Sequence, residues 1–120
     1  MKYIFIAILA LHSGSVLCNE YDKGEKAFLE GDFDTALHIF ENIVTDPKAQ
    51  YGLGIMHMYG LGVETDYKVA KVYLEMSAKT GHPSAQCYLG VLYLQGWGVD
   101  RDYETALVWI TRSAERGVRE

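Results

Sequence analysis

The sequence predicts an all-α protein, an α/α superhelical solenoid of three helix pairs, from two observations. Residues 49–81 align with residues 85–117 with fourteen identities over 33 positions, and self-similarity at such a period is typical of repeat architectures. Within both copies, apolar residues recur at helical spacing and glycines interrupt them at matching places. Each copy is therefore expected to fold as two helices.

Composition limits the alternatives. The 120 residues are 49% apolar and 22% charged, with a formal net charge of −5. This chain is too short for more than one ordinary domain and too apolar to be disordered. Its two cysteines cannot form a disulfide framework or a zinc knuckle. An acidic chain also lacks the basic surface of a nucleic-acid binder, so we expect no nucleic-acid partner.

The N-terminus predicts a signal peptide over residues 1–18. Lys2 precedes an apolar run over residues 3–11, and small and polar residues follow. The run is shorter than the ~20 residues that span a bilayer, so we expect no membrane insertion after cleavage. The mature protein would begin at Asn19 and be periplasmic or secreted. Cleavage after Ser15, acylation of Cys18 and a buried N-terminal element are the alternatives.

Residues 19–120 are expected to form a single domain of three repeats, over about 20–46, 47–82 and 83–117. The motif Asp-aromatic-x-x-Ala begins the second helix of each repeat, at positions 32, 66 and 102. Asp46-Pro47 and His82-Pro83 favour helix starts, because proline suits the first helical position. Gly81 and Gly117 predict helix ends. Gly24, Gly54 and Gly90 would let the paired helices approach closely.

The shared pattern is Ala-x3-Leu-Gly-x5-Gly-x-Gly-Val-x2-Asp-Tyr-x2-Ala-x7-Ala-x2-Gly. It resembles the Sel-one-like repeat (SLR) family, with full copies at 49–81 and 85–117, whereas residues 21–47 resemble a plain tetratricopeptide unit. The resemblance implies a solenoid that acts as an interaction scaffold. One departure is that the family usually has tyrosine three residues after Leu-Gly. The third repeat has Tyr93 there, but the second has His57.

The resemblance also implies a partner surface on the concave side, around the glycine of each first helix. The partner would be a protein or peptide, because the selected positions are mostly apolar and aromatic. They are Tyr21, Glu25, Phe28, Leu29, Lys48, Tyr51, Ile55, Met58, Tyr59, Cys87, Val91, Leu94 and Gln95. Trp97 is either a cap over its own helix pair or an anchor for the partner. The alternative for all of them is packing between helices, and Cys87 would then be a small buried side chain.

The end of the last repeat raises a second hypothesis. Solenoids usually finish with a helix that has a polar outer face, and only residues 118–120 follow the predicted end of the third repeat. We therefore expect self-association through this end, giving a homo-oligomer, or coverage by a partner.

Catalysis is not expected. His38, His57 and His82 are far apart in the sequence, and neither a His-Glu-x-x-His motif nor a phosphate loop after a strand occurs. Cysteine-rich relatives of this repeat carry a cysteine pair per repeat and β-lactamase-like activity, but this chain lacks those pairs. The sequence predicts an exported, non-catalytic interaction module without cofactor or metal. The first alternative is a self-associating structural or regulatory protein. The second, which fewer features of the sequence favour, is a secreted β-lactamase-like enzyme or an enzyme inhibitor.

Overall fold

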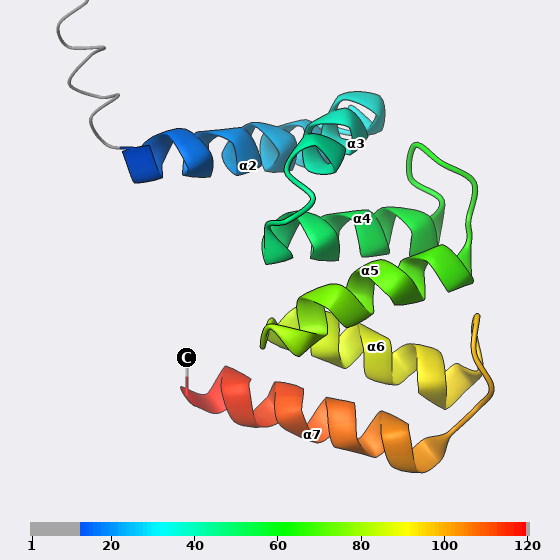
Figure 1. The fold of residues 1–120 in the computed structure, drawn as a ribbon. Coiled ribbons are helices and arrows are strands. Elements are labelled where there is room, and N and C mark those ends of the chain that lie inside the picture. Colours follow the sequence, from blue (N-terminus) through cyan, green and yellow to red (C-terminus); the bar gives the residue numbers. More distant parts are fainter. Residues whose placement is uncertain (1–12, 120) are drawn as a thin grey trace, which may run out of the picture. The chain divides into compact units, whose positions relative to one another are not determined.

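A computed structural model describes residues 13–119 of the chain. Within that range the protein is all-α, as predicted (Figure 1). The helices are α2 (Ser13–Leu29), α3 (Phe33–Asn42), α4 (Pro47–Tyr59), α5 (Tyr67–Lys79), α6 (Pro83–Gln95) and α7 (Tyr103–Arg119). None of these helices is long and apolar enough to cross a bilayer. The chain divides into two compact units, Met1–Ile43 and Val44–Glu120, here called the N-terminal and C-terminal units.

The N-terminal unit contains the helix pair α2 and α3. Gly24 lies against Phe40, and a Cβ on this glycine would lie 2.6 Å from the ring. Asp32 caps α3 because its carboxylate accepts the Thr35 N–H. Helix α2 begins at Ser13 and so spans the predicted cleavage point. The first twelve residues of the predicted signal peptide lie outside the described residues.

The C-terminal unit contains two helix pairs, α4–α5 and α6–α7, with repeated capping. Asp46 and His82 cap α4 and α6, and a proline follows each of them at the first helical turn. Gly60 and Gly96 end these helices in the left-handed conformation, with φ of 69° and 73°. Asp102 caps α7 by accepting the Thr105 N–H. The predicted helix starts and inter-helix breaks are thus present in both repeats.

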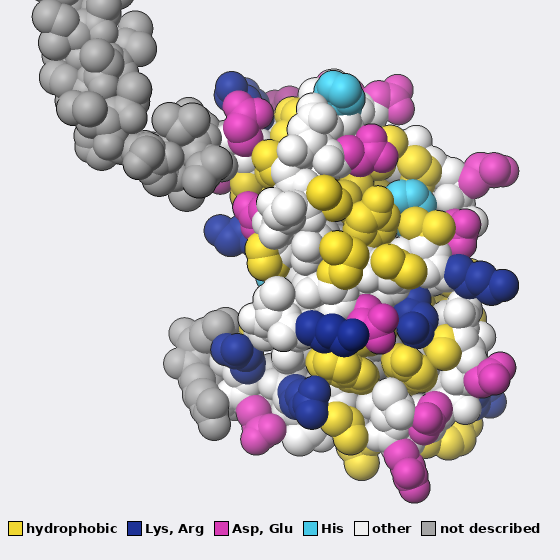
Figure 2. Space-filling view, viewed as in Figure 1, with side chains coloured by type: hydrophobic (Ala, Val, Ile, Leu, Met, Phe, Trp, Pro, Cys, Tyr) yellow, Lys and Arg dark blue, Asp and Glu magenta, His cyan; other side chains and the backbone are white. Residues whose placement is uncertain are grey.

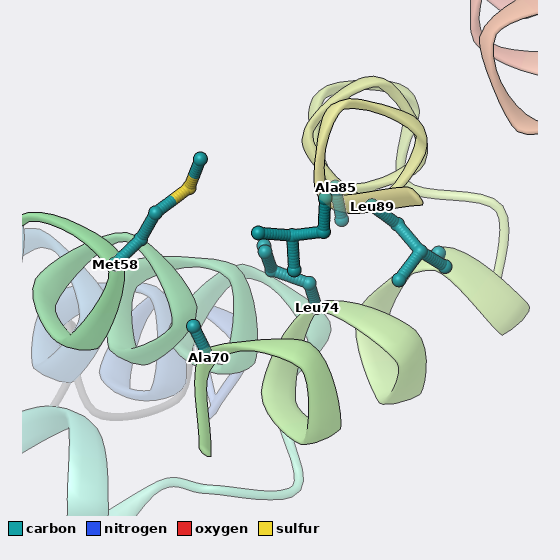
Figure 3. Close-up of a cluster of buried hydrophobic side chains, with 7 residues drawn as sticks. Met58, Ala70, Leu74, Ala85 and Leu89 are labelled. Atoms are coloured by element: carbon teal, nitrogen blue, oxygen red, sulfur yellow. The ribbon is translucent and has the colours of Figure 1, made fainter. Parts of the chain in front are cut away.

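The core of the C-terminal unit lies between α4, α5 and α6. Leu74 of α5 meets Ala85 and Leu89 of α6, and all three are fully buried (Figure 3). Gly54 permits this packing, because a Cβ there would lie 2.6 Å from the Leu74 Cγ atom. Gly90 does the same for Ile110. The small residues therefore set the helix spacing, as the sequence predicted.

A hydrogen bond that recurs in both repeats fixes the angle of each second helix. The Ser77 hydroxyl donates to the Pro47 carbonyl at 2.7 Å, and the Ser113 hydroxyl donates to the Pro83 carbonyl at the same distance. Each bond joins residues 30 positions apart and ties the end of one helix to the start of its partner. Both serines match under the repeat alignment, so this contact was duplicated with the repeat.

One predicted boundary is wrong. Gly117 does not end the last helix, because α7 continues to Arg119. Gly81 has a φ of +98° and lies just after α5, whereas Gly117 is not among the glycines with positive φ. A glycine stops a helix only when it adopts that left-handed conformation.

Candidate partner-binding surface

Three tyrosines from the first helices of the C-terminal unit form one cluster, here called the tyrosine cluster. It consists of Tyr51 and Tyr59 of α4 and Tyr88 of α6. The ring of Tyr88 lies 6.1 Å from that of Tyr51 and 6.5 Å from that of Tyr59, the latter at a right angle. Such separations and edge-to-face angles are favourable for aromatic rings. The cluster therefore joins α4 to α6 along their shared side.

Burial and mutual proximity raise the pKa of two hydroxyls of the cluster, those of Tyr51 and Tyr59. The pKa of Tyr51 is raised above its ordinary value, first by burial and then by the nearby Tyr88 hydroxyl. A hydrogen bond with Ser84 opposes this shift. The pKa of Tyr59 is also raised, by partial burial and by its neighbour Tyr88. These two hydroxyls thus hold their protons more tightly than a free tyrosine does and can donate hydrogen bonds.

His82 extends the cluster at the start of α6. Its ring stacks on Tyr51 with centroids 4.8 Å apart and an interplanar angle of 24°. Its Nδ1 atom accepts the Ala85 N–H at 3.2 Å, which is the cap of α6. The histidine therefore fixes both the helix start and the orientation of the Tyr51 ring.

The residues predicted from the sequence on α4 and α6 differ in exposure. Tyr59 is 54% exposed, and Leu94 and Gln95 are exposed near the end of α6. Ile55 and Val91 are half-buried, and Val91 packs against the core. Ile55 is one helical turn from both Tyr51 and Tyr59 on α4, and Val91 is one turn from Tyr88 on α6.

Met58 requires a correction. Its side chain is 3% exposed and belongs to the core cluster with Ala70 and Leu74 of α5. The same cluster includes Ala85, Leu89 and Leu92 of α6, so Met58 is part of the core that α4, α5 and α6 share. Because it is buried there, it is unavailable to a partner.

Tyr21 and Phe28 lie in the N-terminal unit and make contacts within it. Tyr21 stacks on Phe40 with centroids 5.8 Å apart, and Phe28 contacts Phe33 edge-on at 5.4 Å. Both rings are half-buried. Their described ring contacts thus link α2 to its own partner helix α3.

Trp97 packs between the two repeats of the C-terminal unit. Its ring stacks on Tyr67 of α5 with centroids 5.2 Å apart and an interplanar angle of 21°. It remains 38% exposed. The packing alternative therefore accounts for one side of the indole, while the other side faces solvent.

Tyr88 and His82 were missed by sequence reasoning. Tyr88 aligns with Gly52 in the preceding repeat, so comparison of the repeats gave no aromatic pair at this position. The available signal was its i, i+3 spacing to Val91, which places both residues on one helix face. The role of His82 depends on the approach of Tyr51 from another helix, which no local pattern encodes.

His57, which departs from the family pattern, is a packed residue. Its Nδ1 atom donates to the Leu53 carbonyl at 3.0 Å, and its ring stacks on Tyr73 at 5.6 Å. Across the described residues, no three His, Cys, Asp or Glu side chains converge as a metal site would require.

The repeats and their helix pairs resemble those of known proteins. The Sel1 repeat pattern matches residues 47–82 and 83–118. A Sel1 repeat protein from Oxalobacter formigenes superposes with a TM-score of 0.77 at 25% identity, over 81% of this chain and 39% of that one. A protective antigen of uropathogenic Escherichia coli strains with an SLR fold gives 0.75 at 30% identity, over 82% of this chain and 22% of that one.

The chain thus spans well under half the length of either solved structure. No curated protein matches the sequence significantly. The two matched repeats nonetheless cover more than half of the chain, and they coincide with the helix pairs α4–α5 and α6–α7. The chain belongs to the Sel1 repeat family.

Proposed function

We propose that this protein is an exported interaction module that binds a protein or peptide through the tyrosine cluster on α4 and α6. Sel1 repeats generally mediate protein–protein interaction and are typically non-catalytic. The observation that carries the proposal is the grouping of Tyr51, Tyr59 and Tyr88 on one side of the first helices.

The properties of the tyrosine cluster favour binding of a partner over catalysis. Tyrosine buries a large area while losing few rotamers, and it is enriched among residues that dominate binding energy. The rings are already held by α4, α6 and His82, so binding costs little additional ordering. The favoured partner segment is apolar at its centre and offers polar groups to the hydroxyls.

A photo-crosslinker at Tyr59 tests this surface. Val72 on α5 is the matched control, because it is also 54% exposed but belongs to a second helix. We expect covalent adducts with a partner at position 59 and not at position 72, with loss of the adducts in a Tyr88→Ala variant. Equal adducts at the two positions would contradict the proposal.

Export is supported by the sequence of the first residues, where Lys2 precedes the apolar run over 3–11. The test is N-terminal sequencing of the protein recovered outside the cytoplasm. A start at or near Asn19 is the expected result. Recovery of the whole chain from the cytoplasm alone would contradict export, without bearing on the tyrosine cluster.

The second candidate function is self-association through the outer face of α7. On α5, Tyr67 stacks on Trp97 and Lys71 lies over Tyr93, so the following repeat covers both residues. The matching residues on α7 are Tyr103 and Leu107, which are 61% and 66% exposed. The same face is thus an interface on one helix and an exposed apolar surface on the other.

A second copy of the chain is the favoured occupant, because the face is self-complementary. In an antiparallel pair of α7 helices, Tyr103 of each copy would lie opposite Ala114 of the other. A large side chain then meets a small one at each outer position. This pairing extends the repeat-to-repeat interface already present between α5 and α6.

Leu107→Lys tests this candidate, since lysine is the residue at the equivalent position of α5. We expect the variant to sediment as a monomer at concentrations where the native chain forms dimers. Val108→Lys is the control, because Val108 is 46% exposed on another side of α7. Monomers of the native chain throughout the concentration range would rule out this function.

A further inference from the structure

A cavity of about 400 Å³ lies in the C-terminal unit, where the connection between α5 and α6 meets α7. Three cationic side chains line it, Lys79, Arg112 and Arg116, with Glu115 as its one carboxylate. These three cations define the basic pocket. Lys and Arg side chains gather over α5 to α7 in Figure 2.

Among the side chains that the structure describes, the cations of the basic pocket form no ion pair with an acidic residue. In residues 13–119, neither Lys79 nor the two arginines form an ion pair, whereas Lys71 pairs with Glu75 at 3.7 Å. The whole chain carries an excess of acid, with a net charge of −5. Three unpaired cations in one concavity of an acidic protein focus a positive potential there, which attracts an anion of matching size.

The pocket is shaped by residues with identifiable roles. Arg112 lies over the Trp109 ring at 4.9 Å, and this contact holds the guanidinium at the wall. Gly81 leaves room for Arg116, because any Cβ at that position would collide with its guanidinium. The two arginines are one helical turn apart on α7, and each guanidinium can bind a carboxylate through two hydrogen bonds.

A second cavity of about 460 Å³ adjoins the first and shares Thr80, Gly81 and Arg116 with it. Pro47 and His82, at the starts of α4 and α6, line its other walls. Its one carboxylate, Asp46, already accepts the Lys48 N–H at 2.9 Å as the cap of α4. Together the two cavities offer room for several residues of an extended chain.

We propose that the basic pocket binds an acidic segment of a partner protein, with Asp or Glu carboxylates on Arg112 and Arg116. This site is separate from the tyrosine cluster and selects different chemistry. It gives the protein a second recognition surface, one that depends on charge and therefore weakens as salt concentration rises.

Fluorescence anisotropy with a fluorescein-labelled peptide of eight Asp and Glu residues tests the proposal. We expect binding at low salt and about a tenfold or greater loss in the double variant Arg112→Gln/Arg116→Gln. The control is Lys68→Gln/Arg101→Gln, which removes the same charge from exposed positions elsewhere. It should change the affinity by less than about twofold, as should Tyr59→Ala.

The remaining outcomes overturn the proposal. They are equal losses in the two double variants, equal binding of a matched Asn/Gln peptide, and tighter binding of inorganic phosphate or a single-stranded oligonucleotide than of the acidic peptide. Arg112→Lys/Arg116→Lys keeps the charge but loses the paired hydrogen bonds, so it should bind with intermediate affinity. Circular dichroism confirms that each variant retains its helices.

Discussion

At the level of single residues, glycines on the first helices decide how closely each helix pair packs. A Cβ on Gly90 would lie 2.6 Å from Ile110 and 3.1 Å from the Ala106 carbonyl. Gly117 has nothing within 4 Å of the equivalent point. The same residue type is therefore required at one position and incidental at the other.

Alanine at these two glycines should change stability in opposite directions. Gly90→Ala is expected to lower the free energy of unfolding by about 1–3 kcal/mol, because the backbone carbonyl cannot give way. Gly117→Ala is expected to raise it by up to about 1 kcal/mol, since alanine is the better helix former. Urea denaturation measures both, and a stabilised Gly90→Ala would refute the role of this glycine in packing.

The tyrosine cluster should make stability depend on alkaline pH. The pKa values of Tyr51 and Tyr59 are raised above 10.0, so the folded state holds their protons more tightly than the unfolded state does. Their contribution is complete below pH ~10 and is lost as pH rises through the folded-state pKa values. Thermal melts at increasing pH should show Tm falling less steeply for Tyr51→Phe/Tyr59→Phe than for the native chain.

At the level of elements, the second helix of each Sel1 repeat carries a serine that anchors it. The serine hydroxyl donates to a proline carbonyl in the first turn of the partner helix. Ser113 is half-buried on α7, and the proline carbonyl that it contacts lies on α6. Thr111 is on the same helix and exposed. Removing each hydroxyl in turn therefore distinguishes the stability that comes from the anchoring hydrogen bond from the stability that comes from helix propensity.

Ser113→Ala is expected to cost about 0.5–1.5 kcal/mol of unfolding free energy, the usual net value of one hydrogen bond. Thr111→Ala should be neutral or slightly stabilising, because alanine favours the helix. Chemical denaturation with two-state fitting distinguishes them. Equal effects of the two substitutions would show that the serine bond contributes nothing specific.

The elements were largely predictable, because caps and packing glycines act locally. Asp46-Pro47 and Asp66 mark helix starts through chemistry within four residues. The end of α7 was not predictable, because the backbone angle of Gly117 depends on more than its identity. The basic pocket was not predictable either. Lys79 and Arg116 lie on different helices, and only the packing of α5, α6 and α7 brings them to one cavity.

At the level of the whole molecule, the C-terminal unit contains a complete core of its own. Every buried member of its core cluster lies between Met58 and Leu92. Both matched Sel1 repeats lie within this unit. Neighbouring helix pairs bury each other in such repeats, and stability follows from that stacking.

A chain of residues 44–120 should therefore fold without the N-terminal unit. We expect a helical circular dichroism spectrum and a cooperative thermal transition, because the core residues are all retained. The comparison is the same measurement on the whole chain. A fragment that melts gradually, with no sigmoidal transition, would mean that the N-terminal unit is needed for the fold.

The stacking of Trp97 on Tyr67 has a practical consequence. The chain has two tryptophans, and Trp97 is the one in contact with an aromatic ring of the preceding repeat. In a Trp109→Phe variant, indole emission would come from this junction alone. Time-resolved fluorescence could then follow the separation of one repeat from the next, distinct from the loss of helix that circular dichroism records.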